Sequence, residues 1–402
     1  MSTGRPVRRR IRCLRTGTRG AALALGCSLL GAAAACTGPP ATSSLTGVDR
    51  TAPPRKAGPQ RGFTLVASGD VIPYPTIMNQ AQQDAGGSGH DFRKLFAGVR
   101  PVVSAADVAI CHMETPYGEP GGPFTGYPTF VSPPQVAAAL KETGYDSCST
   151  ASNHTLDAGS DGVRRQLDAL DKAGLGHVGS ARSAAEAGKP ALLRAGTATV
   201  AQLSYTYGTN GIPLPKGKPW IVNRIDPDRI VADARAARRA GADVVVLSLH
   251  WGTEWQEEPD AMQRELADRL TRSKTAGRPD IDLVIGTHNH VPQAYEKVNG
   301  TWVVHGLGDQ VAGVMQDPRG NHGSIARFRF EPPRRDGERW AVTKAEFIPQ
   351  MTDRGPPWRV VNLGEALRSD PGRDDYRKVR DDIREAVLRR GAADDGLVMA
   401  DR

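Results

Sequence analysis

Aromatic residues and, at the N-terminal end, acidic residues are scarce in this sequence. Phe, Trp and Tyr make up 5% of the 402 residues, so aliphatic side chains have to fill most of the core that a 39% hydrophobic content allows. Residues 1–35 contain seven arginines and no Asp or Glu, and without them the formal charge falls from +8 to +1. A nearly neutral remainder does not suggest electrostatic binding to nucleic acid, so we expect no nucleic acid partner.

The apolar run that follows the arginines is too short to cross a membrane. Residues 21–35 carry no charge but fall below the ~20 residues that a spanning helix needs. A basic segment followed by such a run is typical of a signal peptide, here residues 1–35. The run ends in Ala-Ala-Ala-Cys at 33–36, which resembles a bacterial lipobox. We therefore expect an extracytoplasmic lipoprotein, anchored in the cell membrane through a lipidated Cys36.

Two other interpretations of this end stay open. Residues 33–35 would also serve as an ordinary Ala-x-Ala cleavage site before an incidental cysteine, and the apolar run would also serve as a retained anchor. All three interpretations place the folded part outside the cytoplasm. Residues 36–61 are rich in Pro, Ser, Thr and Gly and predict a flexible tether. We expect the folded domain to span 62–350, followed by a C-terminal helical extension with a frayed tail over 351–402.

The chain has few cysteines, and two of the five leave with the predicted signal peptide. Cys111 and Cys148 each lie in an apolar, strand-like run. Outside the cytoplasm these two are able to form one disulfide, but buried thiols in neighbouring strands explain them equally well.

Hydrophobic periodicity predicts an α/β fold with parallel βαβ units in its first half. The segments are expected to form a mixed sheet, or two packed sheets, covered by helices. Predicted strands lie at 63–67, 107–113, 145–151, 243–249, 281–285, 323–330 and 341–349, with hairpins over 191–207 and 293–304. Predicted helices lie at 91–104, 134–143, 162–173, 226–240, 260–273 and 374–389.

Metal-binding residue types occur at or just beyond the ends of the predicted strands. In an open α/β sheet, strand ends are where sites form. Carboxylate, amide oxygen and imidazole together are what a pair of divalent metal ions needs. The sequence therefore predicts a two-metal, phosphoesterase-like site. Its candidates are Asp70 in Ser-Gly-Asp, Glu114 in His-Met-Glu-Thr, Asn153 and His154 in Ser-Asn-His-Thr-Leu-Asp, His250 in His-Trp-Gly, and His288 and His290 in Gly-Thr-His-Asn-His.

These segments, in this order, resemble the calcineurin-like metallophosphoesterase superfamily, and more closely the CapA-like capsule-synthesis family of poly-γ-glutamate proteins. The resemblance covers roughly residues 62–330 and implies two packed mixed β-sheets flanked by helices (α/β/β/α). It is carried by Gly-Asp-Val at 69–71, Met-Glu at 113–114, Ser-Asn-His-Thr-Leu-Asp-Ala-Gly at 152–159, His-Trp-Gly-Thr-Glu-Trp at 250–255, His-Asn-His-Val-Pro-Gln at 288–293 and Gly-Leu-Gly-Asp at 306–309.

The resemblance also implies roles for the candidate residues. It assigns Asp70 and His290 to one metal ion, and Asn153, His250 and His288 to the other, with Glu114 bridging them or nearby. The cofactor is then one or two divalent ions, namely Mn, Fe, Zn or Mg. His154 is expected to face the leaving group as a general acid or charge stabiliser, and Asp157 to orient its ring.

The chain departs from the superfamily or CapA-like pattern at four places, one of which is Glu114, a longer side chain where most phosphatases have Asp. Asp70 is followed by Val71 and Ile72, not by the His of an Asp-x-His motif, so the first metal ion loses an imidazole; CapA-like proteins share this loss. His112 stands where the CapA-like family usually has Asn, and either an extra ligand or a structural residue explains it. Asp309 also stands where Asn is usual and adds a carboxylate that we expect near the rim.

Two functions from different classes follow. The first is a lipid-anchored, metal-dependent hydrolase in the synthesis, export or anchoring of a surface polymer. The second is a non-catalytic metal- or polymer-binding scaffold of a capsule export machine. The missing imidazole favours the scaffold, whereas the intact Asn153-His154 pair favours catalysis. The resemblance implies an anionic surface polymer or a phosphoester as substrate, and membrane export or ligase subunits as partners. A solute-binding lipoprotein is a third hypothesis, against which the His-rich strand ends argue.

Overall fold

The structure is a computed structural model that describes residues 61–335 and 338–401. The predicted signal peptide, Cys36 and all of the tether but its last residue lie outside the described residues. All the described residues belong to one compact unit, and the description below concerns this unit alone.

Most predicted helices are present in the structure. Among the described residues the helices are α1 (Pro75–Asp84), α2 (Arg100–Ser104), α3 (Gln135–Thr143), α4 (Gly159–Ala173), α5 (Ala184–Ala187), α6 (Pro227–Arg239), α7 (Ala261–Thr271), α8 (Leu363–Ser369) and α9 (Asp374–Leu388), with a 3-10 turn at Pro318–Asn321. Of these, α1, α5 and α8 are additional to the prediction.

The strands form two large sheets. The first has the order β16-β15-β14-β1-β2-β3-β4, with β13 beside β1 and β17 beside β15; the second has the order β11-β12-β10-β7-β6-β5. A small pair, β8 (Lys274–Thr275) and β9 (Arg278–Pro279), stands apart. The first sheet contains β1 (Phe63–Val71), β2 (Val108–Met113), β3 (Ser147–Ser149), β4 (Gly176–Val178), β13 (Asp309–Val311), β14 (His322–Glu331), β15 (Ala341–Asp353), β16 (Arg359–Asn362) and β17 (Leu397–Met399). The second contains β5 (Ala191–Ala195), β6 (Ala198–Thr206), β7 (Val244–His250), β10 (Leu283–Thr287), β11 (Tyr295–Val298) and β12 (Thr301–Val304).

The predicted parallel units are confirmed in the first sheet. Strands β1, β2, β3 and β4 are parallel neighbours, connected through α1 to α4. Gly144 and Gly174 end α3 and α4 in the left-handed conformation, with φ of 113° and 74°, which glycine adopts without a steric penalty. Parallel pairing places the carboxyl ends of these strands at one edge of the sheet.

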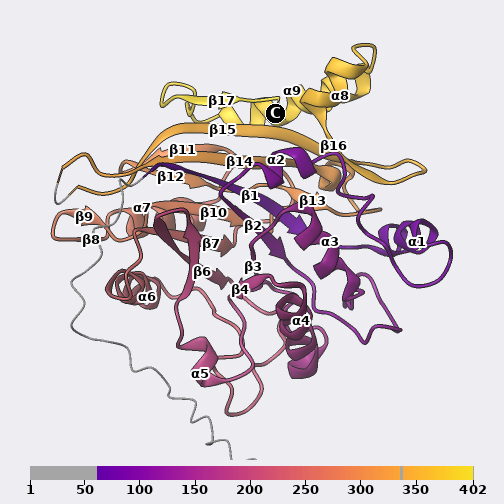
Figure 1. Ribbon diagram of the computed structural model, residues 1–402, viewed down its shortest axis with the longest axis horizontal. Coiled ribbons are helices and arrows are strands. Elements are labelled where there is room, and N and C mark those ends of the chain that lie inside the picture. Colours follow the sequence, from indigo (N-terminus) through magenta and orange to yellow (C-terminus); the bar gives the residue numbers. More distant parts are fainter. Residues whose placement is uncertain (1–60, 336–337, 402) are drawn as a thin grey trace, which may run out of the picture. The chain divides into compact units, whose positions relative to one another are not determined.

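Three hydrophobic clusters fill the spaces between the layers of helices and sheets. One packs α1, α3 and α4 against the outer face of the first sheet, and a second fills the space between the two sheets. The third packs α6 and α7 against the outer face of the second sheet. Figure 1 shows this layering, with α8 and α9 lying along β15. The predicted arrangement of two packed mixed sheets flanked by helices is confirmed.

The second sheet shows how local sequence fixes its connections. Asn299-Gly300 joins β11 to β12 with φ of 51° and 86°, the positive values that a two-residue hairpin turn requires. Asp260 and Gln263 form a capping box at the start of α7, since each side chain accepts from the backbone N–H of the other residue. Every residue of the central strand β7 is buried, as its nearly continuous apolar run predicts.

The C-terminal segment is more ordered than we expected. Residues 397–399 form β17, which pairs in parallel with β15, so the predicted frayed tail is wrong. Leu363, Ile383 and Val387 of α8 and α9 join the same buried cluster as the strands between the sheets. Residues 351–401 are therefore packed into the fold and do not form a separate extension.

The predicted helix at 91–104 is also wrong over most of its length. Only Arg100–Ser104 is helical, and turns precede it. The residues with helical spacing, Phe92, Leu95, Phe96 and Val99, are nevertheless buried in the first cluster. Gly98 lies so close to the carbonyl oxygen of Val360 that a Cβ there would be 2.4 Å from it. Close approach of β16 therefore decides the backbone conformation here.

Cys111 and Cys148 form a disulfide between neighbouring strands. They face each other in the parallel register of β2 and β3, and both are fully buried. The sequence left open a disulfide or two buried thiols, and the structure contains the disulfide.

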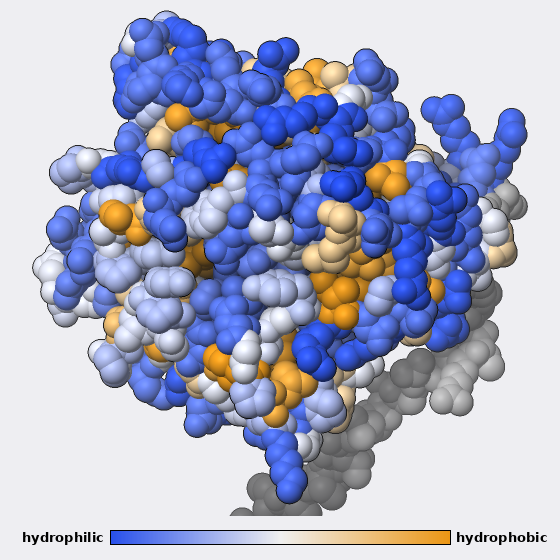
Figure 2. Space-filling view, turned by 180° about the vertical axis from the view of Figure 1, so that it is seen from behind, coloured by the Kyte–Doolittle hydropathy of each residue, from blue (hydrophilic) through white to orange (hydrophobic). Residues whose placement is uncertain are grey.

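Polar and charged side chains cover most of the surface that Figure 2 shows, and apolar residues gather there in several small patches. Among the described residues, no helix has the length and apolarity that crossing a bilayer requires.

Candidate metal centre

The carboxyl ends of strands from both sheets meet at one place. Asp70 lies near the end of β1, within the strand and not in a turn after it, and its register partners are His112 on β2 and Asp309 on β13. His250 is the last residue of β7 and pairs with Thr287, the last of β10. The backbone N–H of His288 donates to Asp70 Oδ2 at 2.9 Å, which joins the two sheets at this point.

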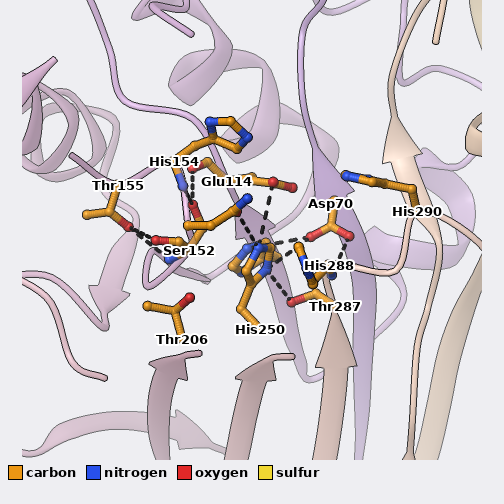
Figure 3. Close-up of polar contacts among 12 residues, drawn as sticks. Asp70, Glu114, Ser152, His154, Thr155, Thr206, His250, Thr287, His288 and His290 are labelled. Atoms are coloured by element: carbon orange, nitrogen blue, oxygen red, sulfur yellow. Dashed lines mark hydrogen bonds and ion pairs between the residues drawn. The ribbon is translucent and has the colours of Figure 1, made fainter. Parts of the chain in front are cut away.

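His250 lies at the middle of a first group of possible metal ligands, which also contains Asp70, His112 and Glu114 (Figure 3). Its Nδ1 is 3.6 Å from Asp70 Oδ1, and its Nε2 is 3.7 Å from Glu114 Oε1. His112 Nε2 approaches the same Asp70 oxygen at 3.5 Å. One ligand atom from each of Asp70, His112, Glu114 and His250 fits within 4.8 Å of the others, which is the spacing of donors around a single ion.

Asn153 and His154 reach the group from the turn after β3. Asn153 Oδ1 is 2.8 Å from His250 Nε2, so the amide oxygen lies among the ligand atoms. Its amide nitrogen donates to Asn210 Oδ1, which fixes the orientation of the amide. Ser152 ties this turn to the end of β2, because its hydroxyl donates to the carbonyl of Glu114 and accepts from the N–H of His154.

His288 and His290 have an unusual backbone conformation. Their φ values are 95° and 59°, in the left-handed region that side chains other than glycine rarely adopt. Such a conformation costs of order 1–3 kcal/mol for each residue and persists where surrounding contacts enforce it. Here it turns both imidazoles back toward the ends of the strands, where they form a second group with the exposed Glu254.

A third group contains Asp70, His290 and Asp309. Asp309 is fully buried, so the sequence-based expectation that it lies near the rim is wrong. Its Oδ1 is 3.0 Å from His290 Nδ1. Burial opposes protonation of His290, but attraction to Asp309 and this hydrogen bond raise the His290 pKa to about 9.

Three carboxylates, Asp70, Glu114 and Asp309, are completely buried in this small region. Among the residues that the structure describes, no Lys or Arg pairs with any of them; their ion-pair partners are imidazoles. Burial, and then repulsion from Asp70 and Asp309, raises the pKa of Glu114 well above its usual value. Burial likewise raises the pKa of Asp309, to about 7. Uncompensated carboxylates of this kind are stabilised by bound cations.

The protonation state of three of the imidazoles also suits metal binding. Burial, followed by repulsion from neighbouring imidazoles, lowers the pKa of His250 and His288 well below the usual value, and burial also lowers that of His112. Neutral imidazole is the form that binds metal ions. Several ligand atoms are buried without a hydrogen-bond partner, namely Asp70 Oδ1, His112 Nε2, both Glu114 carboxylate oxygens, His288 Nδ1 and Asp309 Oδ2. The donor set therefore fits divalent metal ions.

His154 lies beside these groups and belongs to none of them. Its Nδ1 is 2.6 Å from Asp157 Oδ2, and the same carboxylate oxygen accepts from the backbone N–H of Phe130. The ring of Phe130 meets the His154 ring edge-on at 4.8 Å. Asp157 therefore holds Nδ1 and leaves Nε2 as the ring nitrogen available to other groups.

All the residues predicted from the sequence lie at this place, but their grouping differs from the expected one. Asp70 belongs to two groups, and His288 groups with His290 and Glu254. Sequence reasoning gave Glu254 no role, although it lies in the quoted His-Trp-Gly-Thr-Glu segment. Asp309 was noticed only as a departure from a family pattern, because nothing local shows that it pairs with Asp70.

Aromatic side chains border the groups. Tyr207, whose residue is 43% exposed, packs against His288 with ring centroids 4.5 Å apart, and Trp255 packs against His290 at 5.2 Å. Trp251, by contrast, belongs to the core beneath the site and donates to the carbonyl of His305. The two tryptophans of the same segment thus have different roles.

Comparison with known families gives one match over most of the folded unit. The family described as bacterial capsule synthesis protein PGA_cap matches residues 64–314. The chain is 30% identical over 174 residues to the PGA biosynthesis protein CapA of Bacillus subtilis, a match that covers 43% of this chain and 44% of that protein. It is 29% identical over 222 residues to a protein of Mycobacterium tuberculosis described as a probable polyglutamine synthesis accessory protein, covering 52% and 56%.

These matches span about half the length of the curated relatives. Among solved structures, the chain is similar to the calcineurin-like phosphoesterase YfkN from Bacillus subtilis, at 15% identity and a TM-score of 0.39, covering 81% of this chain and all of that one. It is also similar to the NAD nucleotidase of Haemophilus influenzae, at 11% identity and a TM-score of 0.43, covering 85% and 64%.

Proposed function

The chain belongs to the bacterial capsule synthesis protein PGA_cap family, and from this membership and the buried centre we propose that it is a metal-dependent hydrolase of a surface polymer or its phosphoester precursors. One observation carries the proposal. Asp70, Glu114 and Asp309 are fully buried together without a Lys or Arg partner among the described residues, and imidazoles surround them. Such a set is stable when cations occupy it.

The residues around the ions have separable tasks in hydrolysis. Divalent ions held there would activate water and polarise the bond to be broken. Asp70, Glu114, Asn153, His250, His288 and His290 are the proposed protein ligands. His154 lies outside the groups, and Asp157 fixes its ring. For a phosphoester, the P–O bond to the alcohol breaks while water adds to phosphorus, His154 would pass a proton to the leaving oxygen, and the proton that the water loses would return His154 to its protonated form.

We also propose that the protein acts outside the cytoplasm, held at the membrane by lipid on Cys36. The apolar run before Cys36 supports this, and so does the buried disulfide, since disulfides persist in oxidising compartments. An anionic polymer such as poly-γ-glutamate is the proposed substrate or product of the machinery. Membrane export or ligase subunits are the proposed partners.

Metal depletion and reloading test the proposal. The full-length protein is stripped with a chelator, reloaded with Mn²⁺, and analysed for metal content and for cleavage of bis(p-nitrophenyl) phosphate and poly-γ-glutamate. We expect stoichiometric metal and turnover that the chelator abolishes and Mn²⁺ restores. A His250→Ala variant should lose metal and turnover, whereas His177→Asn, a matched change outside the centre, should keep both.

Two other results have distinct meanings. Metal binding without turnover on any phosphoester or polymer would make the protein a metal-binding scaffold of the capsule machinery. Wild-type protein without divalent metal after reloading would overturn the metal centre itself.

A further inference from the structure

Three side chains that are able to bind metal ions lie in one row across three parallel strands. Asp70 on β1 has His112 of β2 as its register partner on one side and Asp309 of β13 on the other. All three residues are buried, with relative exposures of 2% or less. Side chains at matched positions on neighbouring strands point to the same face of a sheet, so the row presents three donors side by side.

We propose that His112 and Asp309 are metal ligands that flank a bridging Asp70. This inference rests on the proposed function and specifies it further, because it states which residues complete the coordination of each ion. The chain continues after Asp70 with Val71, the last residue of β1, and Ile72, whose side chains have no ligand atoms, so additional side-chain ligands have to come from other segments.

Each member of the row has one ligand atom occupied by the protein and one free. Asp70 Oδ2 accepts from the N–H of His288, His112 Nδ1 is 2.8 Å from Ser149 Oγ, and Asp309 Oδ1 is 3.0 Å from His290 Nδ1. Their other atoms, Asp70 Oδ1, His112 Nε2 and Asp309 Oδ2, are buried without a hydrogen-bond partner. Metal ligands have this pattern, since a second residue holds one atom and thereby aims the other at the ion.

The grouping of the donor atoms points to Asp70 as the shared residue. One group joins Asp70 to His112, Glu114 and His250, and another joins it to His290 and Asp309. The first offers two carboxylates and two imidazoles, and the second offers two carboxylates and one imidazole. Ligand sets this rich in oxygen favour Mn²⁺, Fe²⁺ or Mg²⁺ over softer ions.

The competing interpretation gives both residues a structural role. Asp309 would then only orient His290, and His112 would only pack against His250, whose ring centroid is 4.7 Å away. Asparagine variants separate the two interpretations. In Asp309→Asn the amide oxygen is able to accept from His290 as the carboxylate does, and in His112→Asn the amide retains a hydrogen-bond donor and acceptor, but the carboxylate or imidazole ligand is lost.

The test measures Mn²⁺ binding by the full-length protein with isothermal titration and elemental analysis, and includes Asp161→Asn and His177→Asn as exposed or distant controls. We expect Asp309→Asn and His112→Asn each to bind one ion at least ~100-fold more weakly, and the two control variants to bind Mn²⁺ as the wild type does. A purely orienting residue costs about 10–100-fold when its contact is lost, and asparagine keeps that contact. Loss below about 10-fold in both variants would overturn the inference.

A crystal structure with Mn²⁺ gives the direct answer. Anomalous scattering should place one ion about 2–2.5 Å from Asp309 Oδ2 and the other within similar reach of His112 Nε2. Ions more than about 3 Å from both atoms would show that the two residues are not ligands, while leaving the metal centre intact. Wild-type protein that binds no Mn²⁺ would instead contradict the proposed function.

Discussion

At the scale of single residues, His154 separates catalysis from metal binding. It follows Asn153, a proposed ligand, yet its own ring is held by Asp157 and the edge of Phe130. No group of metal-binding residues among the described part of the chain includes it. A side chain so placed is able to exchange a proton with a bound substrate without being needed to hold the ions.

We expect His154→Asn to keep metal content and melting temperature and to lower turnover by ~10²–10⁴-fold, the usual contribution of a positioned acid or base. Phosphodiester turnover together with elemental analysis checks this, with His177→Asn as the matched control. Loss of metal from the variant would make His154 a ligand. Unchanged turnover in an active enzyme would remove its proposed role in proton transfer.

At the scale of elements, the disulfide ties β2 to β3 directly behind the centre. Cys111 and Cys148 are 37 residues apart, and His112 and Ser149, the next residues, contact each other in the centre. Closing a loop of this length reduces the entropy of the unfolded chain by an amount worth about 3–4 kcal/mol.

The double variant Cys111→Ala/Cys148→Ala should therefore unfold at lower denaturant concentration, with a free energy of unfolding smaller by about 3–4 kcal/mol. Urea unfolding with and without reductant measures the difference. Reductant should destabilise the wild type to a similar extent and leave the double variant unchanged. A wild type that is indifferent to reductant throughout unfolding would contradict the prediction.

The C-terminal segment connects to the second sheet through a charge cluster. Arg390, just beyond α9, pairs with Glu296 of β11 at 2.9 Å, and His305 contacts the same carboxylate at 3.1 Å. The hydrogen bond with His305 first, and then Arg390, lower the pKa of Glu296 to about 2 against the opposing effect of burial. Because the folded-state pKa lies below the ordinary 4.5, the ionised group stabilises the fold above that pH, and this stability is lost as pH falls toward 2.

Arg390→Ala should cost about 1 kcal/mol of unfolding free energy at pH 7, and the difference from wild type should shrink between pH 4.5 and 2 as Glu296 becomes protonated. Denaturant unfolding over this pH range checks the sign. Lys378→Ala on the exposed face of α9 serves as the control, because its pair with Asp382 is solvent-exposed and worth little. A difference that grows on acidification would be inconsistent with the cluster.

The elements also show where sequence reasoning succeeds and fails. Helices α3 and α4 could be predicted because periodic apolar residues end at Gly144 and Gly174. At 91–99 the same periodicity correctly predicts burial but not helix, since tertiary packing against β16 decides the backbone. Strand β17 was missed because only its pairing with β15 stabilises such a short segment.

At the scale of the whole molecule, the order of the motifs predicts that the candidate residues lie close together. It does not predict which of them belong to the same group of ligand atoms. Parallel strands bring their carboxyl ends to one edge, so proximity of Asp70 and Glu114 follows from the pattern. The role of Asp309 depends on the pairing of β13 with β1, which closes a long loop and has no local signal. The left-handed His288 and His290 likewise depend on contacts across both sheets.

The proposed lipid anchor makes a prediction for the protein in its cell. Cys36→Ala should leave the protein unprocessed or release it from membranes, because the acyl chains provide the attachment. Membrane fractionation and the mass of the mature N-terminus check this, and Ser43→Ala in the tether is a matched control. Unchanged size and membrane partition of Cys36→Ala would contradict the anchor.

Asp70 receives a hydrogen bond from the backbone of His288, 218 residues further along the chain. Closing a loop of this length costs chain entropy, and the donors come from strands of both sheets, so the complete donor set exists only once the sheet pair is assembled. If the proposed centre binds metal, a chain caught before that stage would have no assembled site and would take up whichever ion surrounds it when folding is complete. Because ion availability helps to decide which metal a site acquires, the compartment in which folding finishes would then select the metal of the proposed centre. The place of folding, more than the place of synthesis, would then set the chemistry of this protein.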